Sequence, residues 1–321
     1  MKTIFLSDAE SELRRVYGTD EQVFCKNDLL SHPEDFADTE YIFSTWGMPA
    51  FSREEIRSIL PNLKAVFYAA GSVQAFAHPF IECGVKVFSA WAANAVPVAE
   101  YTVAQIVLAN KGFFKTAPLA SSGNRSEAHR LLANFCGNYG TKIGIIGVGM
   151  IGTLVAKMLK SYKLEVLAFD PFLSDEKAAE LGVTKVSLPT LFSECSVVSN
   201  HLANNEQTVC MLNGELFALM RPYATFINTG RGAQVVEEEL ISVLSARPDL
   251  TAILDVTYPE PPLPDSGFYK LDNCILTPHI AGSSGDEVQR MAEYMYEEYD
   301  SFTQNKPCRF EVTAEMLKTM A

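Results

Sequence analysis

Three glycines in the pattern Gly-x-Gly-x-x-Gly, at positions 147, 149 and 152, constrain the fold of this chain more than any other feature. An apolar run at residues 142–146 precedes them, and an apolar helical pattern begins at Thr153. A strand, a glycine turn and a helix in this order start a βαβ unit, in which the backbone can approach a pyrophosphate at the helix N-terminus. The motif therefore predicts a dinucleotide-binding domain built on a parallel sheet.

A carboxylate stands where the ribose of a bound dinucleotide needs one. Residues 164–169 form the next predicted strand, and Asp170 follows it, a little over 20 positions after Gly147. Such an acid accepts hydrogen bonds from ribose hydroxyls and repels a 2′-phosphate. Pro171 and Phe172 come next, without an arginine to hold that phosphate, which favours NAD over NADP. A glycine turn that only joins a strand to a helix is the alternative interpretation.

Apolar runs bounded by turns alternate with helical patterns over most of the chain, which is typical of α/β proteins. A long helix from Pro97 to about residue 115 and an amphipathic helix at 285–303 separate two sets of strands. We predict two doubly wound parallel-sheet domains. A Rossmann NAD-binding domain of residues 96–287 is inserted into a flavodoxin-like substrate-binding domain of residues 1–95 and 288–321. The strands are expected at 2–5, 41–44, 63–68, 85–88, 142–146, 164–169, 197–200, 225–228, 251–255 and 274–276.

Composition excludes several classes of function. The 321 residues carry a formal net charge of −13, which would repel nucleic-acid phosphates, so we expect no nucleic-acid partner. The first apolar run is too short for a signal peptide, and no uncharged apolar run reaches about 18 residues, so we expect a cytoplasmic protein without a membrane partner. Seven scattered cysteines without a Cys-x-x-Cys pair predict reduced thiols and no metal site.

Three polar residues stand just past predicted strands of the second domain. Arg231 has a planar guanidinium that suits a carboxylate held by two hydrogen bonds. Glu260 lies in a proline-rich segment, and His279 lies beside small residues. Each has an ordinary alternative: a surface arginine, a solvated acid and a packed histidine. Because ligands of open α/β sheets bind at the carboxyl ends of the strands, the three together predict a catalytic group.

An ordered set of motifs carries a resemblance to a known family. The motifs are Ala70-Gly71-Ser72-Val73, Val98-Ala99-Glu100-Tyr101-Thr102, the glycine motif, Phe169-Asp170-Pro171, Asn228-Thr229-Gly230-Arg231-Gly232, Asp255-Val256 with Glu260-Pro261, and Thr277-Pro278-His279-Ile280-Ala281-Gly282. Over nearly its whole length the chain resembles the D-isomer-specific 2-hydroxyacid dehydrogenases, the group that includes phosphoglycerate, glycerate and hydroxypyruvate enzymes.

This resemblance implies an oxidoreductase that transfers a hydride between NAD(H) and a small 2-oxo or D-2-hydroxy acid. Arg231 would bind the substrate carboxylate, His279 would exchange the proton of the C2 oxygen, and Glu260 would hold the imidazole. The backbone amides of Gly71, Ser72 and Val73 would bind the other end of the acid. The implied cofactor-binding residues are Thr102, Gly147, Gly149, Met150, Ile151, Gly152, Asp170, Pro171, His201, Thr208, Asn228, Thr229, Gly230, Asp255 and Gly282. Residues 97–140 resemble the arm through which the family forms homodimers.

Some positions depart from the family pattern, and other functions stay open. Ala203, Asn204 and Asn205 replace a proline, a leucine and a threonine in the wall that packs on adenine, and Gly230 replaces an alanine or serine. An NAD(H)-sensing regulator or corepressor on the same fold is the main alternative. An S-adenosylmethionine methyltransferase shares the glycine loop but does not need the three catalytic residues. A formate dehydrogenase usually pairs its histidine with glutamine, so Glu260 argues against it.

Overall fold

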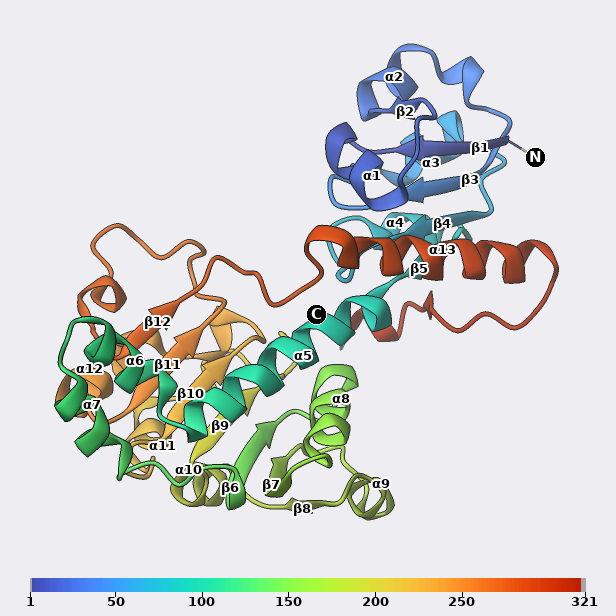
Figure 1. Ribbon diagram of the computed structural model, residues 1–321. Coiled ribbons are helices and arrows are strands. Elements are labelled where there is room, and N and C mark those ends of the chain that lie inside the picture. Colours follow the sequence, from blue (N-terminus) through green and yellow to red (C-terminus); the bar gives the residue numbers. More distant parts are fainter. Residues whose placement is uncertain (1, 319–321) are drawn as a thin grey trace. The chain divides into compact units, whose positions relative to one another are not determined.

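The computed structural model describes residues 2–318 and divides the chain into two compact units (Figure 1). The chain leaves the first unit after Asn94 and returns to it at Ser283. We refer to the first unit as the first domain and to residues 95–282 as the second domain. The return falls five residues before the expected position, because Ser283 already bonds within the first domain: its N–H donates to Asn94 Oδ1 at 2.9 Å.

A six-stranded sheet in the order β13-β5-β4-β3-β1-β2 forms the first domain. Five of these strands are parallel in the flavodoxin-like order, and β13 pairs antiparallel to β5. The five strands match the predicted parallel sheet, and the antiparallel edge strand β13 was not predicted. The two-residue strands β2 and β13 are too short to show a sequence period. The strands are β1 (Lys2–Leu6), β2 (Val23–Phe24), β3 (Thr39–Ser44), β4 (Ala65–Tyr68), β5 (Lys86–Ser89) and β13 (Glu311–Val312).

Helices cover both faces of this sheet (Figure 1). On one face, Met291 and Met295 of the last helix pack against an aromatic layer that includes Phe67 and Phe88, whose rings stack at 4.9 Å. This burial accounts for the amphipathic pattern that the sequence shows there. The helices are α1 (Glu10–Tyr17), α2 (Lys26–Ser31), α3 (Arg53–Ile59), α4 (Ala77–Glu82) and α13 (Val288–Thr303), with 3-10 turns η1 (Pro33–Asp35), η4 (Gly285–Glu287) and η5 (Met316–Lys318).

The long helix α5 (Trp91–Asn110) differs from its prediction at both ends. It begins six residues before Pro97, so that proline lies inside the helix and does not mark its first turn. It ends before Gly112, whose φ of +68° starts a new helix, α6 (Phe113–Ser121). Among residues 2–318, α5 alone has the length and hydropathy of a membrane span, yet 56% of its most apolar 18-residue stretch is buried in the structure. A core helix meets the same criterion.

The second domain contains a seven-stranded sheet in the order β12-β11-β10-β9-β6-β7-β8, and every pair is parallel. The order reverses between β6 and β9, which is where open α/β sheets bind ligands. The doubly wound fold of both domains is thus confirmed, and in the second domain the short β8 was not predicted. The strands are β6 (Tyr139–Ile146), β7 (Lys163–Phe169), β8 (Val183–Lys185), β9 (Val197–Asn200), β10 (Thr225–Asn228), β11 (Thr251–Leu254) and β12 (Cys274–Leu276).

Two apolar cores lie on opposite faces of this sheet. One packs mainly under α5 and α8 (Met150–Leu159), and the other packs under α10 (Leu188–Glu194), α11 (Gly214–Ala218) and α12 (Glu237–Ala246). Ile145 and Ile227 point into the first core, and Ile146 and Phe226 point into the second. The alternation explains why apolar residues follow one another directly in these strands, as in Ile145-Ile146 and Phe226-Ile227. The remaining helices are α7 (Arg125–Leu132), α8 (Met150–Leu159), α9 (Asp175–Leu181), α10 (Leu188–Glu194), α11 (Gly214–Ala218) and α12 (Glu237–Ala246), with 3-10 turns η2 (Gly232–Gln234) and η3 (Gly267–Lys270).

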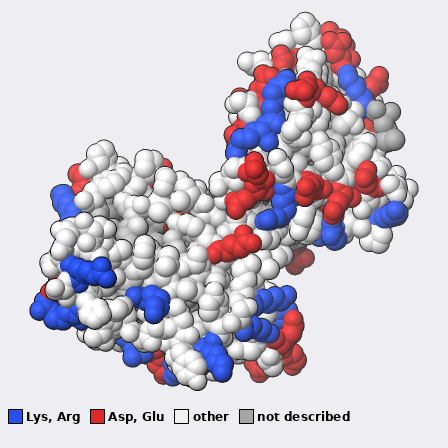
Figure 2. Space-filling view, in the orientation of Figure 1, with Lys and Arg blue, Asp and Glu red and all other residues white. Residues whose placement is uncertain are grey.

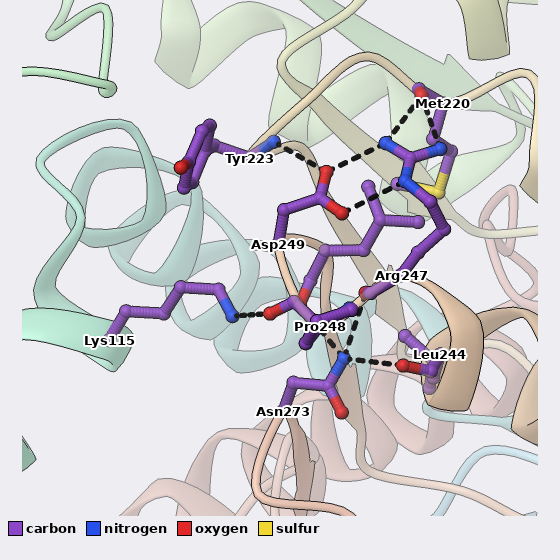
Figure 3. A network of polar contacts seen from close by, with 9 residues as sticks. Lys115, Met220, Tyr223, Leu244, Arg247, Pro248, Asp249 and Asn273 are labelled. Atoms are coloured by element: carbon purple, nitrogen blue, oxygen red, sulfur yellow. Dashed lines mark hydrogen bonds and ion pairs between the residues drawn. The ribbon is translucent and has the colours of Figure 1, made fainter. Parts of the chain in front are cut away.

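A polar network attaches α6 to the body of the second domain (Figure 3). Lys115 donates to the carbonyl oxygen of Pro248 at 2.6 Å, and burial lowers the pKa of this lysine. Arg247 holds Asp249 through two hydrogen bonds of 2.9 and 2.7 Å, and Asn273 Nδ2 donates to three carbonyl oxygens nearby. The Lys115 contact therefore joins α6 to the loop at residues 247–250 of the same domain.

Candidate functional site

The glycine turn after β6 leaves room for a ligand on one side only. Gly147 has a φ of +83°, and a Cβ there would lie 2.9 Å from the backbone of His201. A Cβ on Gly152 would collide with the carbonyl oxygen of Gly147, whereas one on Gly149 would meet open space. Helix α8 begins at Met150 without a side-chain cap, so its first N–H groups and its positive dipole end are free for an anion. These features fit a pyrophosphate.

Asp170 follows β7 and lies against this turn. Its Oδ2 accepts a hydrogen bond from the Val148 N–H at 2.7 Å, and its Oδ1 accepts one from the Phe172 N–H at 2.8 Å. The acid is half-buried, while Pro171 and Phe172 are exposed. The structure thus places the predicted ribose acid beside the predicted pyrophosphate turn.

Buried polar side chains connect β9, β10 and α5 beneath the turn. His201 is 8% exposed; its Nε2 lies 2.9 Å from Ser199 Oγ and its Nδ1 lies 3.3 Å from Thr229 Oγ1. Thr229 Oγ1 is also 3.4 Å from Thr102 Oγ1. Burial lowers the pKa of His201 to about 3, so this imidazole is neutral near pH 7. Both of its ring nitrogens are occupied by protein groups.

Asp255, at the end of β11, builds the loop that carries His279. Its carboxylate accepts hydrogen bonds from Thr277 Oγ1 at 2.5 Å and from the backbone N–H groups of Ile280 and Ala281, both at 2.9 Å. Its own carbonyl oxygen accepts from the His279 N–H at 3.1 Å. His279 has a φ of +53°, which a non-glycine residue adopts only where its surroundings hold it. The 3% exposed Asp255 supplies that constraint.

His279 and Glu260 meet although they are far apart in sequence. His279 Nδ1 lies 2.6 Å from Glu260 Oε1, and both side chains are about half-exposed. Arg231 is in the same domain: burial lowers the pKa of its guanidinium, and the negative charge of Glu260 offsets only part of this lowering. A Cβ on Gly232 would collide with the backbone of Thr257, so the Arg231 loop packs directly on the loop that leads to Glu260. The structure therefore brings the three predicted catalytic residues to one edge of the sheet.

A cavity of about 290 Å³ borders Glu260. Its lining combines apolar and acidic residues, namely Asp255, Thr257, Glu260, Pro261, Pro262, Leu276, Thr277 and Pro278. No lysine or arginine lines it, so the cavity does not itself supply a positive charge to an anionic ligand.

In the first domain, the loop at residues 71–73 presents backbone N–H groups. Ser89 Oγ donates to the carbonyl oxygens of Ala70 and Gly71 at 2.9 and 2.6 Å, and Thr45 Oγ1 donates to that of Ala69 at 2.8 Å. The carbonyl oxygens of Ala70 and Gly71 therefore point toward Ser89, and the N–H groups of Gly71 and Ser72, which share those trans peptide planes, point the opposite way. Sequence reasoning missed Ser89 and Thr45, because a buried serine or threonine at a strand end carries no distinctive signal.

Other predicted residues have structural partners of their own. Thr208 Oγ1 donates to the Ala203 carbonyl oxygen at 2.7 Å and closes the turn at 203–208. Asn228 Oδ1 accepts from the Gly230 N–H at 3.1 Å. Sequence reasoning did not find Asn200 and Gln234, which are both buried. Asn200 Nδ2 donates to Gln234 Oε1, and the same oxygen accepts from the Arg231 N–H. Within residues 2–318 no three His, Cys, Asp or Glu side chains gather as a metal site.

Comparisons with known proteins agree with this geometry. The model of the D-isomer-specific 2-hydroxyacid dehydrogenase NAD-binding domain matches residues 105–281. A D-3-phosphoglycerate dehydrogenase of Archaeoglobus fulgidus is 30% identical over 70% of this chain, but the match covers only 42% of that longer protein. An (S)-sulfolactate dehydrogenase of Chromohalobacter salexigens is 32% identical over 66% of this chain and 68% of its own length.

The solved structures support the fold. A D-2-hydroxyisocaproate dehydrogenase superposes with a TM-score of 0.79 at 20% identity, covering 98% of this chain and all of the other. The matched family domain binds NAD(H), and the glycine turn and Asp170 fit that cofactor. The chain belongs to the D-isomer-specific 2-hydroxyacid dehydrogenase family.

Proposed function

We propose that this protein interconverts a small 2-oxo acid and the corresponding D-2-hydroxy acid with NAD(H). The contact of 2.6 Å between His279 Nδ1 and Glu260 Oε1 carries the proposal, and the loop of Arg231 packs on the segment that leads to Glu260. When bound, NAD(H) supplies or accepts the hydride at carbon C2. The residues that hold it are those of the glycine turn, the first turn of α8 and Asp170.

His279 moves the proton that accompanies the hydride. Because its Nδ1 faces Glu260, its Nε2 is the nitrogen that can reach the C2 oxygen. In the direction of reduction the imidazolium donates this proton to the forming alkoxide, and in oxidation the neutral ring accepts it from the hydroxyl. Glu260 fixes the ring orientation and the tautomer with its proton on Nδ1.

Arg231 binds the substrate carboxylate. One of its Nη1 hydrogens is used by the Gly230 carbonyl oxygen at 2.8 Å, which leaves the rest of its five N–H donors for the ligand. Burial strengthens such a charge-assisted pair, because less water competes for it. In the first domain, we propose that the N–H groups of Gly71, Ser72 and Val73 bind the acid as well.

Net charge and surface composition limit which binding partners we propose. The face in Figure 2 shows acidic and basic side chains side by side, and the net charge of −13 opposes binding of a polyanion. We infer a cytoplasmic enzyme that uses NAD in preference to NADP. We also infer a homodimer formed through residues 97–140, since Leu108, Phe113 and Leu132 in this segment are large exposed apolar side chains.

The test is to follow NADH absorbance with the purified protein across a panel of 2-oxo acids, with D and L alcohols in the reverse direction and NADPH in parallel. We expect turnover of at least one acid, only the D alcohol as reverse substrate, and preference for NADH.

Arg231→Ala should raise the KM for the acid about 100-fold, since charged hydrogen bonds are worth about 1.5–3 kcal/mol. Arg221→Ala, at an exposed arginine of the same domain, should not. NADH binding without any turnover would instead favour the regulator.

A further inference from the structure

A cluster of three buried side-chain amides lies under the loop that carries Arg231. Asn200 ends β9, Asn228 ends β10 and Gln234 ends η2, and none is more than 1% exposed. Asn200 Nδ2 donates to Asn228 Oδ1 at 3.0 Å and to Gln234 Oε1 at 2.6 Å. We refer to these residues as the amide cluster. Amides buried to this extent are costly unless their donors and acceptors are paired, so their arrangement is specific.

The amide cluster bonds to both backbone groups of Arg231. Gln234 Oε1 accepts a hydrogen bond from the Arg231 N–H at 3.1 Å, and Asn228 Nδ2 donates to the Arg231 carbonyl oxygen at 3.2 Å. The peptide groups on either side of the Arg231 Cα are thereby fixed. Because the guanidinium side chain starts from this Cα, the cluster determines where its donors can reach.

Gly230 completes the arrangement. A Cβ at this position would lie 2.8 Å from Gln234 Oε1 and 2.9 Å from Asn200 Nδ2, which is closer than packed side chains allow. The glycine that departs from the family pattern therefore leaves the space that the amide cluster occupies. Gln234 Nε2 also donates to the Leu202 carbonyl oxygen at 2.9 Å, which ties the Arg231 loop to the segment leading into residues 203–208.

We propose that Gln234, together with Asn200, is a positioning residue that sets the affinity of Arg231 for the substrate carboxylate. Neither amide has to touch the substrate, since both act through the peptide groups around Arg231. The proposal rests on the proposed function, because it takes Arg231 as the carboxylate-binding group. It adds to that function a specific pair of residues that no sequence motif marks.

The experiment measures two quantities on each variant of the full chain. One is the KM and kcat for the best 2-oxo acid at saturating NADH. The other is the Kd for oxalate, a carboxylate probe that does not react, titrated calorimetrically into the NADH-saturated protein. For Gln234→Leu we expect KM and the oxalate Kd to rise about tenfold, with kcat changed less than threefold and the NADH Kd within twofold. Gln234→Glu keeps the acceptor for the Arg231 N–H but sets its second oxygen against the Leu202 carbonyl oxygen, so it should regain only part of the affinity.

Asn273→Leu is the matched control. Asn273 is a buried amide of the same domain whose Nδ2 donates to the carbonyl oxygens of Leu244, Arg247 and Leu250, and it makes no contact with Arg231 (Figure 3). Its loss should lower the melting temperature as much as Gln234→Leu does and leave the oxalate Kd within twofold. The double variant Asn200→Leu/Gln234→Leu replaces both members of one contact by apolar groups, so it should regain stability but not affinity.

The outcomes separate the two proposals. Oxalate binding and KM that stay at the native values in Gln234→Leu would overturn the positioning role, and so would equal weakening in Asn273→Leu. If the native protein binds oxalate but reduces no 2-oxo acid, and Gln234→Leu loses the oxalate binding, the proposed reaction is contradicted. The positioning role would still stand in that case. A native protein that neither binds oxalate nor turns over would contradict both.

Discussion

Two histidines of the second domain lie at the same edge of one sheet and have opposite surroundings. His201 directly follows β9, is 8% exposed, and has Ser199 and Thr229 on its two ring nitrogens. His279 lies three residues beyond β12, is exposed, and has Glu260 on one nitrogen and nothing from the second domain on the other. The difference teaches that the surroundings, and not the residue type, decide which imidazole can exchange protons with a ligand.

The largest effect is expected at the exposed histidine. His279→Ala removes the proton donor and should lower kcat by about 10²- to 10⁴-fold, with the NADH Kd within twofold and the melting temperature unchanged. His78→Ala is the control, since His78 forms an exposed contact of 3.4 Å with Glu82 in the first domain. Stopped-flow and steady-state rates would measure the effect, and full activity in His279→Ala would remove the proton-transfer role.

Asp255 connects the two environments, because it is buried like His201 but holds the loop of His279. Asp255→Asn places an amide where the carboxylate accepts from Thr277 Oγ1, Ile280 N–H or Ala281 N–H. We expect a loss of about 2 kcal/mol in the free energy of unfolding, together with a lower kcat. Asp265→Asn, at an exposed acid of the same domain, should change neither. Unaltered urea unfolding in Asp255→Asn would contradict the assigned role.

The buried histidine should make the protein sensitive to acid. Its pKa is about 3 in the folded protein and near 6.5 when unfolded, so the unfolded state binds more protons below pH 6.5. The stability that depends on the neutral His201 imidazole is complete above pH 6.5 and is lost as the pH falls towards 3. Between pH 8 and 5 this one group should cost about 2 kcal/mol of stability. Urea unfolding at several pH values measures it, and His201→Gln should flatten the dependence; an equal slope in that variant would refute the assignment.

The smallest effect is expected at Ser199, the hydrogen-bond partner of the buried His201. Ser199→Ala leaves His201 Nε2 without its partner at 2.9 Å, which should cost about 1 kcal/mol of stability at pH 7. Turnover should stay within twofold of the native value, because Ser199 is fully buried behind the ring. Thermal unfolding and steady-state rates on the same preparation would show it. A large kcat loss without loss of stability would place Ser199 and His201 among the reacting groups.

Local signals were enough for the fold because both domains repeat βα units. The strands expected at residues 197–200 and 225–228 coincide with β9 and β10, because their adjacent apolar pairs, Val197-Val198 and Phe226-Ile227, are buried on the two faces of the sheet. The prediction of the helix start at Pro97 was wrong because proline is also tolerated within a helix that tertiary packing stabilises. The strands β2, β8 and β13 were not predicted, because two or three residues are too few to show an alternating apolar pattern.

For the candidate site, the sequence identified residues whose chemistry is distinctive: the three glycines, Asp170, Arg231, Glu260 and His279. It did not identify Gln234, Asn200 or Ser89, because a buried amide or hydroxyl gains its meaning only from the groups around it. The departure at Gly230 was visible in the sequence, but the buried amides that a Cβ there would approach too closely were not.

By itself the sequence determined the family, the two parallel-sheet domains and the set of reactive side chains, since periodicity and residue chemistry are local properties. Only the tertiary structure decided which partners those side chains have. It separated the neutral, buried His201 from the His279 held by Glu260, and it assigned Asp255 to the His279 loop. The physical reason is that hydrogen bonding and desolvation depend on atoms brought together from distant parts of the chain.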